Sequence, residues 1–220
     1  MSTFLLLTIT GLGLGAMYFL VASGLSLIYG LMGVLNFAHG VFLTVTAYAL
    51  WYTESKLGGV PILPRYLISA GVGLVVAVVF AALTELVLIR PLYGRHIEQV
   101  LVTVGLALSV TALGIDVRKS FTLVFMIGGL AAGIAAVLYT LYSTTIDPQQ
   151  GTSLVIFAFI VVVIGGLGSI RGTLWAAVLV GLVQQYANYY ASSGLGDLSV
   201  VLLLGIILIV RPGGFSRSFA

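Results

Sequence analysis

Long apolar runs separated by short polar stretches make up this chain. The first run, from Phe4 to Trp51, is long enough for two membrane crossings and a turn near Gly24, Gly30 or Gly33, because one crossing takes about 20 apolar residues. The later runs are Tyr66 to Ile89, Val100 to Leu113, Phe121 to Tyr142, Ser153 to Gly168, Thr173 to Tyr190 and Leu198 to Val210. These runs predict an all-α, polytopic transmembrane helix bundle with about eight apolar segments, in one domain of residues 1–220.

Several of these segments are shorter than a full crossing. Such segments are tolerated in a membrane when they are re-entrant, tilted or broken and their backbone is covered by protein or lines a watery cavity. Glycines spaced four residues apart also lie on one helix face and let two backbones approach closely. The pairs with this spacing are Gly11 and Gly15, Gly129 and Gly133, and Gly168 and Gly172. We therefore expect a packed bundle with some re-entrant or broken helices.

Composition supports a membrane protein. Hydrophobic residues make up 60% of the chain and charged residues 7%, and the mean hydropathy is +1.23, whereas soluble domains carry roughly a quarter charged residues. The basic residues form no run, so no nucleic-acid partner is predicted. The absence of cysteine excludes disulfides and thiolate metal sites. The first apolar segment lacks a basic stretch before it and a cleavage-site break, so we interpret it as a retained span.

Asn36 and His39 are polar residues inside the first apolar run. An unsatisfied polar group at bilayer depth costs several kcal/mol, so such residues mark either a transport pathway or a buried helix contact, and both interpretations stay open. If the helix is continuous here, their spacing of three places them on one face. No metal site or cofactor is predicted, because His96 is the only other histidine and no acidic cluster accompanies it.

Other polar and glycine positions have mainly structural interpretations. Glu85 lies one helical turn before Arg90 and is expected to pair with it. Gln184 and Asn188, spaced i and i+4, favour hydrogen bonds between helices over substrate binding. The glycine cluster Gly165, Gly166 and Gly168, followed by Ser169, fits close helix packing. It also fits a helix break whose freed backbone groups face a cavity.

Charge predicts the orientation of the second half. Basic residues at alternate segment ends are expected in the cytoplasm, together with the C-terminus. They are Arg118, Lys119, Arg171, Arg211 and Arg217. The intervening ends carry Tyr139, Tyr142, Tyr189 and Tyr190, which would form part of the outer aromatic belt.

The first half conflicts with this orientation and leaves the side of the N-terminus open. If Arg90 and Arg95 are cytoplasmic and the run from Val100 to Leu113 crosses once, Arg118 lies outside.

A series of motifs in the chain resembles one transport family. The motifs are G-x-x-N-F-A-H-G at 33–40, an acidic residue and R-P-L-Y-G at 85–94, T-V-G-L at 103–106, L-G-I-D-V-R at 113–118, V-V-V-I-G-G-L-G-S-I-R-G at 161–172 and V-R-P-G at 210–213. In this order they are similar to the permease subunits of branched-chain amino-acid ABC importers. The resemblance covers most of the chain.

The resemblance implies roles and partners. The residues expected along the substrate path are Asn36, Phe37, His39, Gly40, Gly165, Gly166, Gly168 and Ser169, and those expected on the ATPase-coupling side are Gly114, Asp116 and Arg118. Expected partners are ATP-binding cassette ATPase subunits, a second permease subunit (the same or related), an extracytoplasmic substrate-binding protein and membrane lipid. The expected location is the bacterial plasma (inner) membrane, and the expected solutes are branched-chain or related amino acids.

One departure from the family pattern lies near Val110 and Thr111. In the family, the T-[IV]-G-L and L-G-I-[ND] segments are separated by an external loop, a span and a basic coupling loop, whereas here Leu106 and Leu113 are nearly adjacent. One additional crossing would also return Arg118 to the cytoplasm. We therefore predict a missing internal segment here. The alternative expectation is a segment between Leu108 and Gly114 that enters and leaves the same side.

The chain has no enzyme motif. It lacks G-x-x-x-x-G-K-[ST], G-x-S-x-G and H-E-x-x-H, so nucleotide binding through a P-loop and hydrolase chemistry are disfavoured, and we expect no enzyme. Two alternatives to an importer subunit stay open. One is an ion-coupled secondary carrier, for which Glu85 and His39 are the candidate ionisable groups. The other is a non-transporting accessory membrane subunit.

Overall fold

Every element of the described chain is helical. The computed structural model describes residues 2–33, 36, 39–90, 117–143, 150–191 and 194–215. The elements are α1 (Ser2–Met32), α2 (His39–Lys56), α3 (Ile62–Leu83), a π-helical turn η1 (Thr84–Ile89), α5 (Val117–Tyr142), α6 (Gln150–Gly165), α7 (Ile170–Tyr190) and α8 (Leu195–Val210). The predicted all-α helix bundle is confirmed, and most helices begin or end about one turn from the predicted run.

Helix lengths are uneven. Three helical stretches are long and apolar enough to cross a membrane, namely Thr3–Met32, Ile62–Ile89 and Lys119–Tyr142. The bent pair α6 and α7 counts as a fourth crossing if it is one span. The first apolar run divides unequally, because α1 takes 31 residues and α2 only 18, with Glu54 and Lys56 near its end. The predicted run from Val100 to Leu113 lies outside the described residues.

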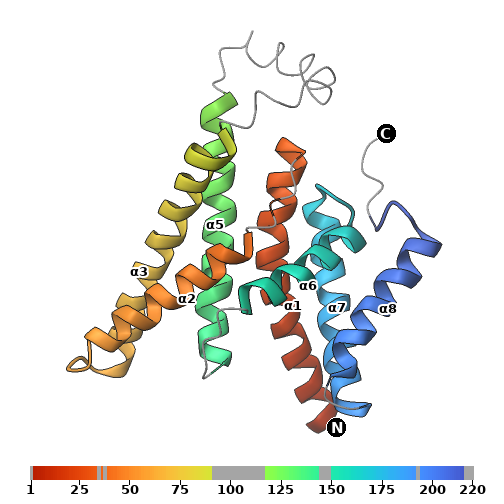
Figure 1. The fold of residues 1–220 in the computed structure, drawn as a ribbon. Coiled ribbons are helices and arrows are strands. Elements are labelled where there is room, and N and C mark those ends of the chain that lie inside the picture. The colour runs from red at the N-terminus through yellow and green to blue at the C-terminus, as the bar shows by residue number, and fades with distance from the viewer. Residues whose placement is uncertain are drawn as a thin grey trace.

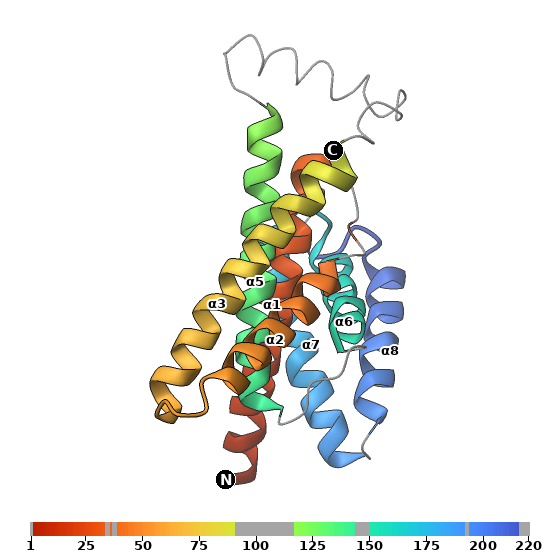
Figure 2. The same cartoon turned by 60° about the vertical axis from the view of Figure 1, so that its left-hand side comes forward.

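Helix α1 runs through the middle of the bundle and contacts α5, α6 and α7. Helices α3 and α5 lie side by side on one flank and α7 and α8 on the other, while α2 and α6 begin inside the bundle at mid-height (Figures 1 and 2). The short helices α2 and α6 therefore stand among longer ones, with their amino ends in the protein interior.

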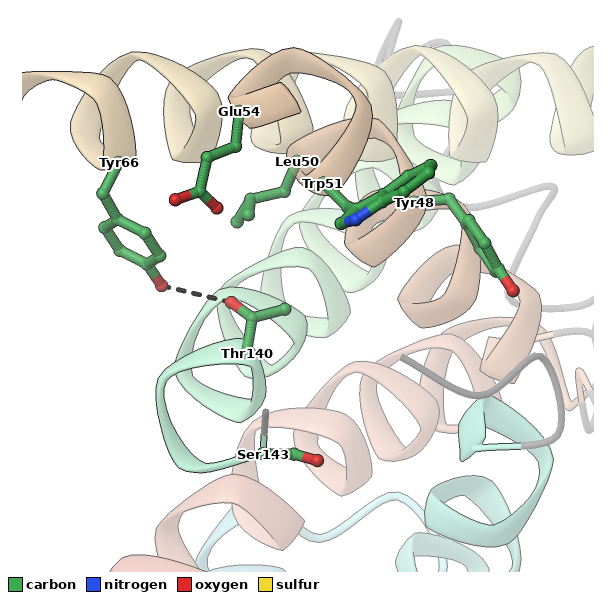
Figure 3. Close-up of a pocket in the computed structure, with 7 residues that line it drawn as sticks. All are labelled: Tyr48, Leu50, Trp51, Glu54, Tyr66, Thr140 and Ser143. Atoms are coloured by element: carbon green, nitrogen blue, oxygen red, sulfur yellow. Dashed lines mark hydrogen bonds between the residues drawn. The ribbon is translucent and has the colours of Figure 1, made fainter. Parts of the chain in front are cut away.

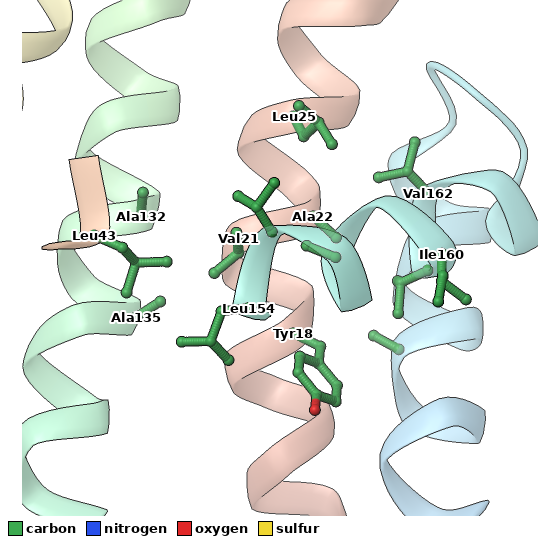
Figure 4. Close-up of a cluster of buried hydrophobic side chains, with 14 of the residues drawn as sticks. Tyr18, Val21, Ala22, Leu25, Leu43, Ala132, Ala135, Leu154, Ile160 and Val162 are labelled. Atoms are coloured by element: carbon green, nitrogen blue, oxygen red, sulfur yellow. The ribbon is translucent and has the colours of Figure 1, made fainter. Parts of the chain in front are cut away.

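The hydrophobic core gathers around α1 and α6 (Figure 4). Val21 and Ala22 of α1 are fully buried, and Leu154 of α6 packs in the same cluster. Helix α5 contributes small residues, Ala132 and Ala135, which let its backbone come close to α1. In contrast, α3 and α8 present exposed apolar side chains such as Val75 and Ile209 on the outside of the bundle.

The predicted glycine pairs lie at helix contacts. A Cβ on Gly15 would lie 2.8 Å from the carbonyl oxygen of Ala177, so this glycine lies at the contact of α1 with α7. A Cβ on Gly133 would lie 2.9 Å from the Cβ of Ala77 in α3. Added side chains would therefore push these helices apart, and the small residues set the spacing of the bundle.

The end of η1 and the beginning of α5 lie next to each other. The Thr122 hydroxyl donates to Glu85 Oε2 at 2.7 Å, and Arg90 Nε lies 3.9 Å from Glu85 Oε1. The predicted pairing of Glu85 with Arg90 is confirmed, with Glu85 fully buried. Residues 91–116, including the junction near Val110, lie outside the described residues, and the helices flanking them meet at one end of the bundle.

Candidate functional site

The first apolar run is interrupted between α1 and α2. Gly33 has a φ of +65°, a left-handed conformation that glycine adopts without strain, and its N–H donates to the Tyr29 carbonyl at 2.8 Å. The chain becomes helical again at His39, whose N–H donates to the Asn36 carbonyl at 3.1 Å. The helix is therefore not continuous, and the condition that would place Asn36 and His39 on one helix face is not met. Phe37 lies outside the described residues.

His39 is completely buried in a space lined by glycines. A Cβ on Gly24 of α1 would lie 2.9 Å from His39 Nε2, and one on Gly128 of α5 would lie 3.5 Å from His39 Cε1. The ring packs edge-on against Phe42, with the centroids 5.3 Å apart. The Val21 carbonyl interacts with the ring without meeting hydrogen-bond geometry, and neither ring nitrogen has a hydrogen-bond partner among the described residues.

Gly40 brings the first turn of α2 onto the first turn of α6. A Cβ on Gly40 would collide with the carbonyl oxygen of Gly151, and a Cβ on Gly151 would collide with Gly40 and with the Thr44 hydroxyl. Two helix amino ends therefore meet backbone to backbone inside the bundle. Amino ends of helices carry partial positive charge and unpaired N–H groups, which favour anionic groups when a space opens beside them.

The second interruption separates α6 from α7 with a bend of 120°. Gly166 and Gly168 have φ values of +95° and +82°, which side-chain-bearing residues rarely adopt. Ser169 caps α7, since its hydroxyl oxygen accepts from the Gly172 N–H at 3.2 Å. The sequence left close packing and a helix break open for this glycine cluster, and the structure shows both a break and close packing here.

The two arms of this break are packed tightly together. A Cβ on Gly165 would lie 2.5 Å from the Thr173 backbone nitrogen. The Phe215 N–H, from the segment after α8, donates to the Ile164 carbonyl at 2.9 Å and so satisfies an acceptor at the end of α6. The turn is thus fixed by its own residues and by the chain near residue 215.

The structure brings the two interruptions together. A Cβ on Gly30, near the end of α1, would lie 3.1 Å from Gly168 Cα. Helix α6 runs from the Gly40–Gly151 contact at one end to the Gly30–Gly168 contact at the other. Of the expected coupling residues, Gly114 and Asp116 lie outside the described residues, and Arg118 is in the first turn of α5.

The other polar predictions have clear outcomes. Tyr18 of α1 donates to Gln184 Oε1 at 2.7 Å, and Gln184 Nε2 donates to Asp197 Oδ1 of α8 at 2.8 Å. Asn188 Oδ1 accepts from the Gly196 N–H at 3.0 Å. The predicted helix-linking roles are confirmed. In the part of the chain that the structure describes, no three His, Asp or Glu side chains gather as a metal site.

Sequence reasoning missed the neighbours of the candidate residues. Gly24 and Gly128, which surround His39, and Gly151, which meets Gly40, belong to no motif and to no predicted pair. Their only signal was the presence of a glycine inside or at the start of an apolar run. Such a glycine marks a close approach without telling which segment approaches.

A bundle of apolar helices long enough to cross a membrane, with two interruptions covered by neighbouring helices, defines a polytopic helical membrane protein, because irregular backbone at membrane depth is tolerated where protein buries it or where it lines a watery cavity. The chain belongs to the family described as "Branched-chain amino acid transport system / permease component", whose family model matches residues 7–111 and 107–211.

Individual relatives support this membership. The chain is 23% identical to the high-affinity branched-chain amino acid transport system permease protein BraD of Pseudomonas aeruginosa, across 94% of this chain and 93% of BraD. It is 32% identical to LivH of Escherichia coli, across 46% of this chain and 33% of LivH. It is 34% identical to the autoinducer 2 import system permease LsrD of Salmonella paratyphi B, across 41% of this chain and 31% of LsrD. No solved structure matches.

Proposed function

We propose that this chain is the transmembrane permease subunit of an ABC importer, and that it forms part of the translocation path for branched-chain or related amino acids. The observation that carries the proposal is the family match over residues 7–211, which includes both helix interruptions. Separate ATPase subunits supply the energy. An extracytoplasmic binding protein delivers the solute, and a second permease subunit, identical or related, completes the path.

The path runs along α6 and its two contacts. At one end are Asn36, His39 and Gly40, and at the other are Gly165, Gly166, Gly168 and Ser169. Phe37, which the family motif also includes, lies outside the described residues. Gly40 of α2 touches Gly151 of α6, and Gly165 of α6 touches Thr173 of α7, so no space is left between α6 and these two neighbours. The path is therefore closed along α6 in this conformation. Transport requires α6 to separate from α2 in part of the cycle, which exposes the two amino ends to the solute carboxylate.

The orientation follows from the charged ends of the helices. Lys119 of α5 and Arg171 of α7 lie at the beginnings of two parallel helices, and Arg211 follows the end of the antiparallel α8. These residues share one half of the bundle, which we assign to the cytoplasm of a bacterial inner membrane. Gly114, Asp116 and Arg118 then belong to the ATPase-coupling side, and the C-terminus is cytoplasmic. The tyrosines at the ends of α5 and α7 then lie on the extracytoplasmic side of the membrane.

Two observations support a missing internal segment near Val110 and Thr111. The BraD alignment is 286 residues long, whereas 94% of 220 residues is about 207, so about 80 positions have no counterpart here. The family model also matches in two pieces, 7–111 and 107–211, that meet at this junction. Because η1 and α5 meet at the same end of the bundle, the intact segment crosses the membrane an even number of times. The 26 residues present are too few for two crossings of about 20 residues each.

The missing segment gives a second candidate function, a non-transporting accessory subunit. The coupling loop that the family pattern places here would be absent, so the chain would assemble with the other subunits without driving uptake. Sequencing the encoding DNA through codons 108–114 decides whether the segment is present in the gene. A gene that encodes the segment supports the permease, and a gene that lacks it supports the accessory subunit.

Reconstitution tests the transport function directly. The complete importer is reconstituted in proteoliposomes from the chain with its missing segment restored, the ATPase subunits, the second permease and the binding protein. These proteoliposomes should accumulate labelled leucine with ATP and not with a non-hydrolysable analogue. The 220-residue chain by itself should neither hydrolyse ATP nor accumulate leucine. Accumulation by the chain alone, driven by a proton or sodium gradient, would contradict the importer and establish the ion-coupled carrier.

A further inference from the structure

A pocket opens between α2, α3 and α5 (Figure 3). It lies near the end of α5, whereas Lys119 and Arg171 lie at the beginnings of α5 and α7, in the other half of the bundle (Figure 1). Its volume is about 370 Å³, which is at the small end of the range of ligand sites, roughly 300–1,000 Å³. The lining residues are Tyr48, Leu50, Trp51, Glu54, Tyr66, Thr140 and Ser143. None of these belongs to the expected substrate path, and the pocket is separate from the two helix interruptions.

An ion pair supplies the charge of this pocket. The Glu54 carboxylate points into the pocket space (Figure 3). Its Oε1 lies 3.4 Å from an Arg65 guanidinium nitrogen. The two side chains are 33% and 26% exposed, so both charges are accessible to a ligand. Arg65 and Glu54 also line an adjoining cavity of about 280 Å³, which Trp51 shares. A negative and a positive group therefore stand side by side at one opening.

The uncharged walls of the pocket are aromatic, and one of them is held in place. The Tyr66 hydroxyl donates to the Val137 carbonyl at 2.7 Å and lies 3.2 Å from the Thr140 hydroxyl. Trp51 stays 54% exposed beside the carboxylate. An aromatic face near a carboxylate attracts an ammonium group through its quadrupole as well as through charge.

We infer that this pocket binds a compact zwitterion whose primary ammonium lies close to an anionic group, and that its ligand is a free α-amino acid. The ammonium pairs with Glu54, next to the exposed Trp51 side chain. The ligand's anionic group pairs with Arg65, which lines the adjoining cavity and is 26% exposed. The inference rests on the proposed function, because the proposed orientation places the pocket on the extracytoplasmic side.

The headgroup of phosphatidylethanolamine shares this chemistry, so the experiment separates the two sources. Labelled leucine is titrated onto the 220-residue chain in nanodiscs free of phosphatidylethanolamine, with N-acetyl-leucine and leucinamide as competitors that each lack one charge. Leucine should compete at least about tenfold better than either, since one charged hydrogen bond contributes about 1.5–3 kcal/mol. Because this comparison changes only the ligand, it does not depend on the folding of a variant.

Variants locate the binding in the pocket. Glu54→Gln should raise the Kd for leucine about tenfold or more, since it removes the charge that holds the ammonium. Trp51→Ala should raise it about threefold. The matched control is Trp175→Ala, because Trp175 is 68% exposed on α7 in the other half of the bundle, and it should leave the Kd unchanged. Monodisperse elution of each variant shows that it is folded.

The outcomes are distinct. Leucine binding that depends on Glu54 supports the amino-acid site. A second outcome is that leucine does not bind and that less phosphatidylethanolamine copurifies with Glu54→Gln than with the parent chain. This outcome assigns the zwitterion site to the lipid and overturns the amino acid as ligand. Neither effect, or equal binding of leucine and N-acetyl-leucine, overturns the whole inference. The assay contains no ATPase subunit and no gradient, so loss of uptake in the reconstituted importer leaves its result unchanged.

Discussion

The two helix interruptions differ in how their polar groups are satisfied. Polar groups at the α6–α7 break have hydrogen-bond partners, since Ser169 caps α7 and the Phe215 N–H, from the segment after α8, satisfies the end of α6. The α1–α2 break instead places His39 against Gly24 and Gly128 of two other helices, with no hydrogen bond from the ring to any described residue. Both breaks have backbone hydrogen bonds, but only the α6–α7 break has a side-chain cap, whereas the buried His39 ring is held by packing among the described residues.

We therefore call the α6–α7 break the rigid corner and the α1–α2 break, around His39 and Gly40, the adaptable break. A capped turn with satisfied backbone groups resists change, because opening it leaves donors and acceptors unpaired in a poorly hydrated interior. A buried imidazole without a hydrogen bond loses little when its neighbours move, and it gains if water or a solute reaches it. We therefore expect the α6–α7 corner to keep its shape during transport, while the surroundings of His39 and Gly40 rearrange.

The largest effect should come from filling the glycine contacts. Gly40→Ala and Gly165→Ala each place a methyl group against backbone, and we expect each to lower the free energy of unfolding by about 1–3 kcal/mol. The control is Gly205→Ala in α8, where an added Cβ meets nothing within 4 Å and helix propensity improves by up to about 1 kcal/mol. Thermal unfolding of the detergent-purified chain measures all three. Equal stability of the three variants would show that these backbones do not touch.

The sequence was sufficient to predict the helices but not their neighbours. The runs ending at Tyr142, Tyr190 and Val210 predicted helix ends that the structure confirms, because apolar length and flanking polar residues are local properties. The break after Gly165 was also readable, since a cluster of glycines before a serine favours a turn and an N-cap.

What sequence could not predict is the pairing of distant segments. The contacts of Gly24 with Gly128 and of Gly40 with Gly151 join residues more than a hundred positions apart, and nothing in a local pattern specifies such a partner. The pattern also left the turn open between Gly24, Gly30 and Gly33, and the structure places it at Gly33, which takes a left-handed conformation. The pocket around Glu54 was missed for the same reason, since its walls come from three helices.

Removing the cap of the rigid corner should have a medium effect. Ser169→Ala eliminates the acceptor for the Gly172 N–H and should lower stability by about 0.5–2 kcal/mol. Ser169→Asp keeps an acceptor at the N-cap and adds a favourable charge at the helix amino end, so it should recover most of the loss. The same thermal unfolding assay compares the pair. If Ser169→Ala were as stable as the parent chain, the Ser169 cap would not stabilise the α6–α7 turn.

Asn36→Ala tests whether the buried Asn36 amide at the α1–α2 break links helices or acts in transport. Asn36 is 5% exposed, and its backbone carbonyl accepts from the His39 N–H, an interaction that alanine retains. If the side chain only links helices, stability should fall by about 0.5–2 kcal/mol with uptake per assembled complex unchanged. We expect uptake per complex to fall while assembly and basal ATPase activity persist. Quantifying assembled complexes by size-exclusion chromatography beside the uptake assay separates the two results.

His39→Leu should have the smallest effect on stability. Leucine keeps an apolar volume between Gly24 and Gly128, and the lost ring nitrogens make no hydrogen bond with the described residues, so the change should stay within about 1.5 kcal/mol. Uptake per complex should nevertheless fall, because the polar group that meets the solute in the open state is gone. Normal uptake by His39→Leu, by Asn36→Ala and by the double variant would make both side chains helix contacts. The two breaks would then differ in bonding but not in function.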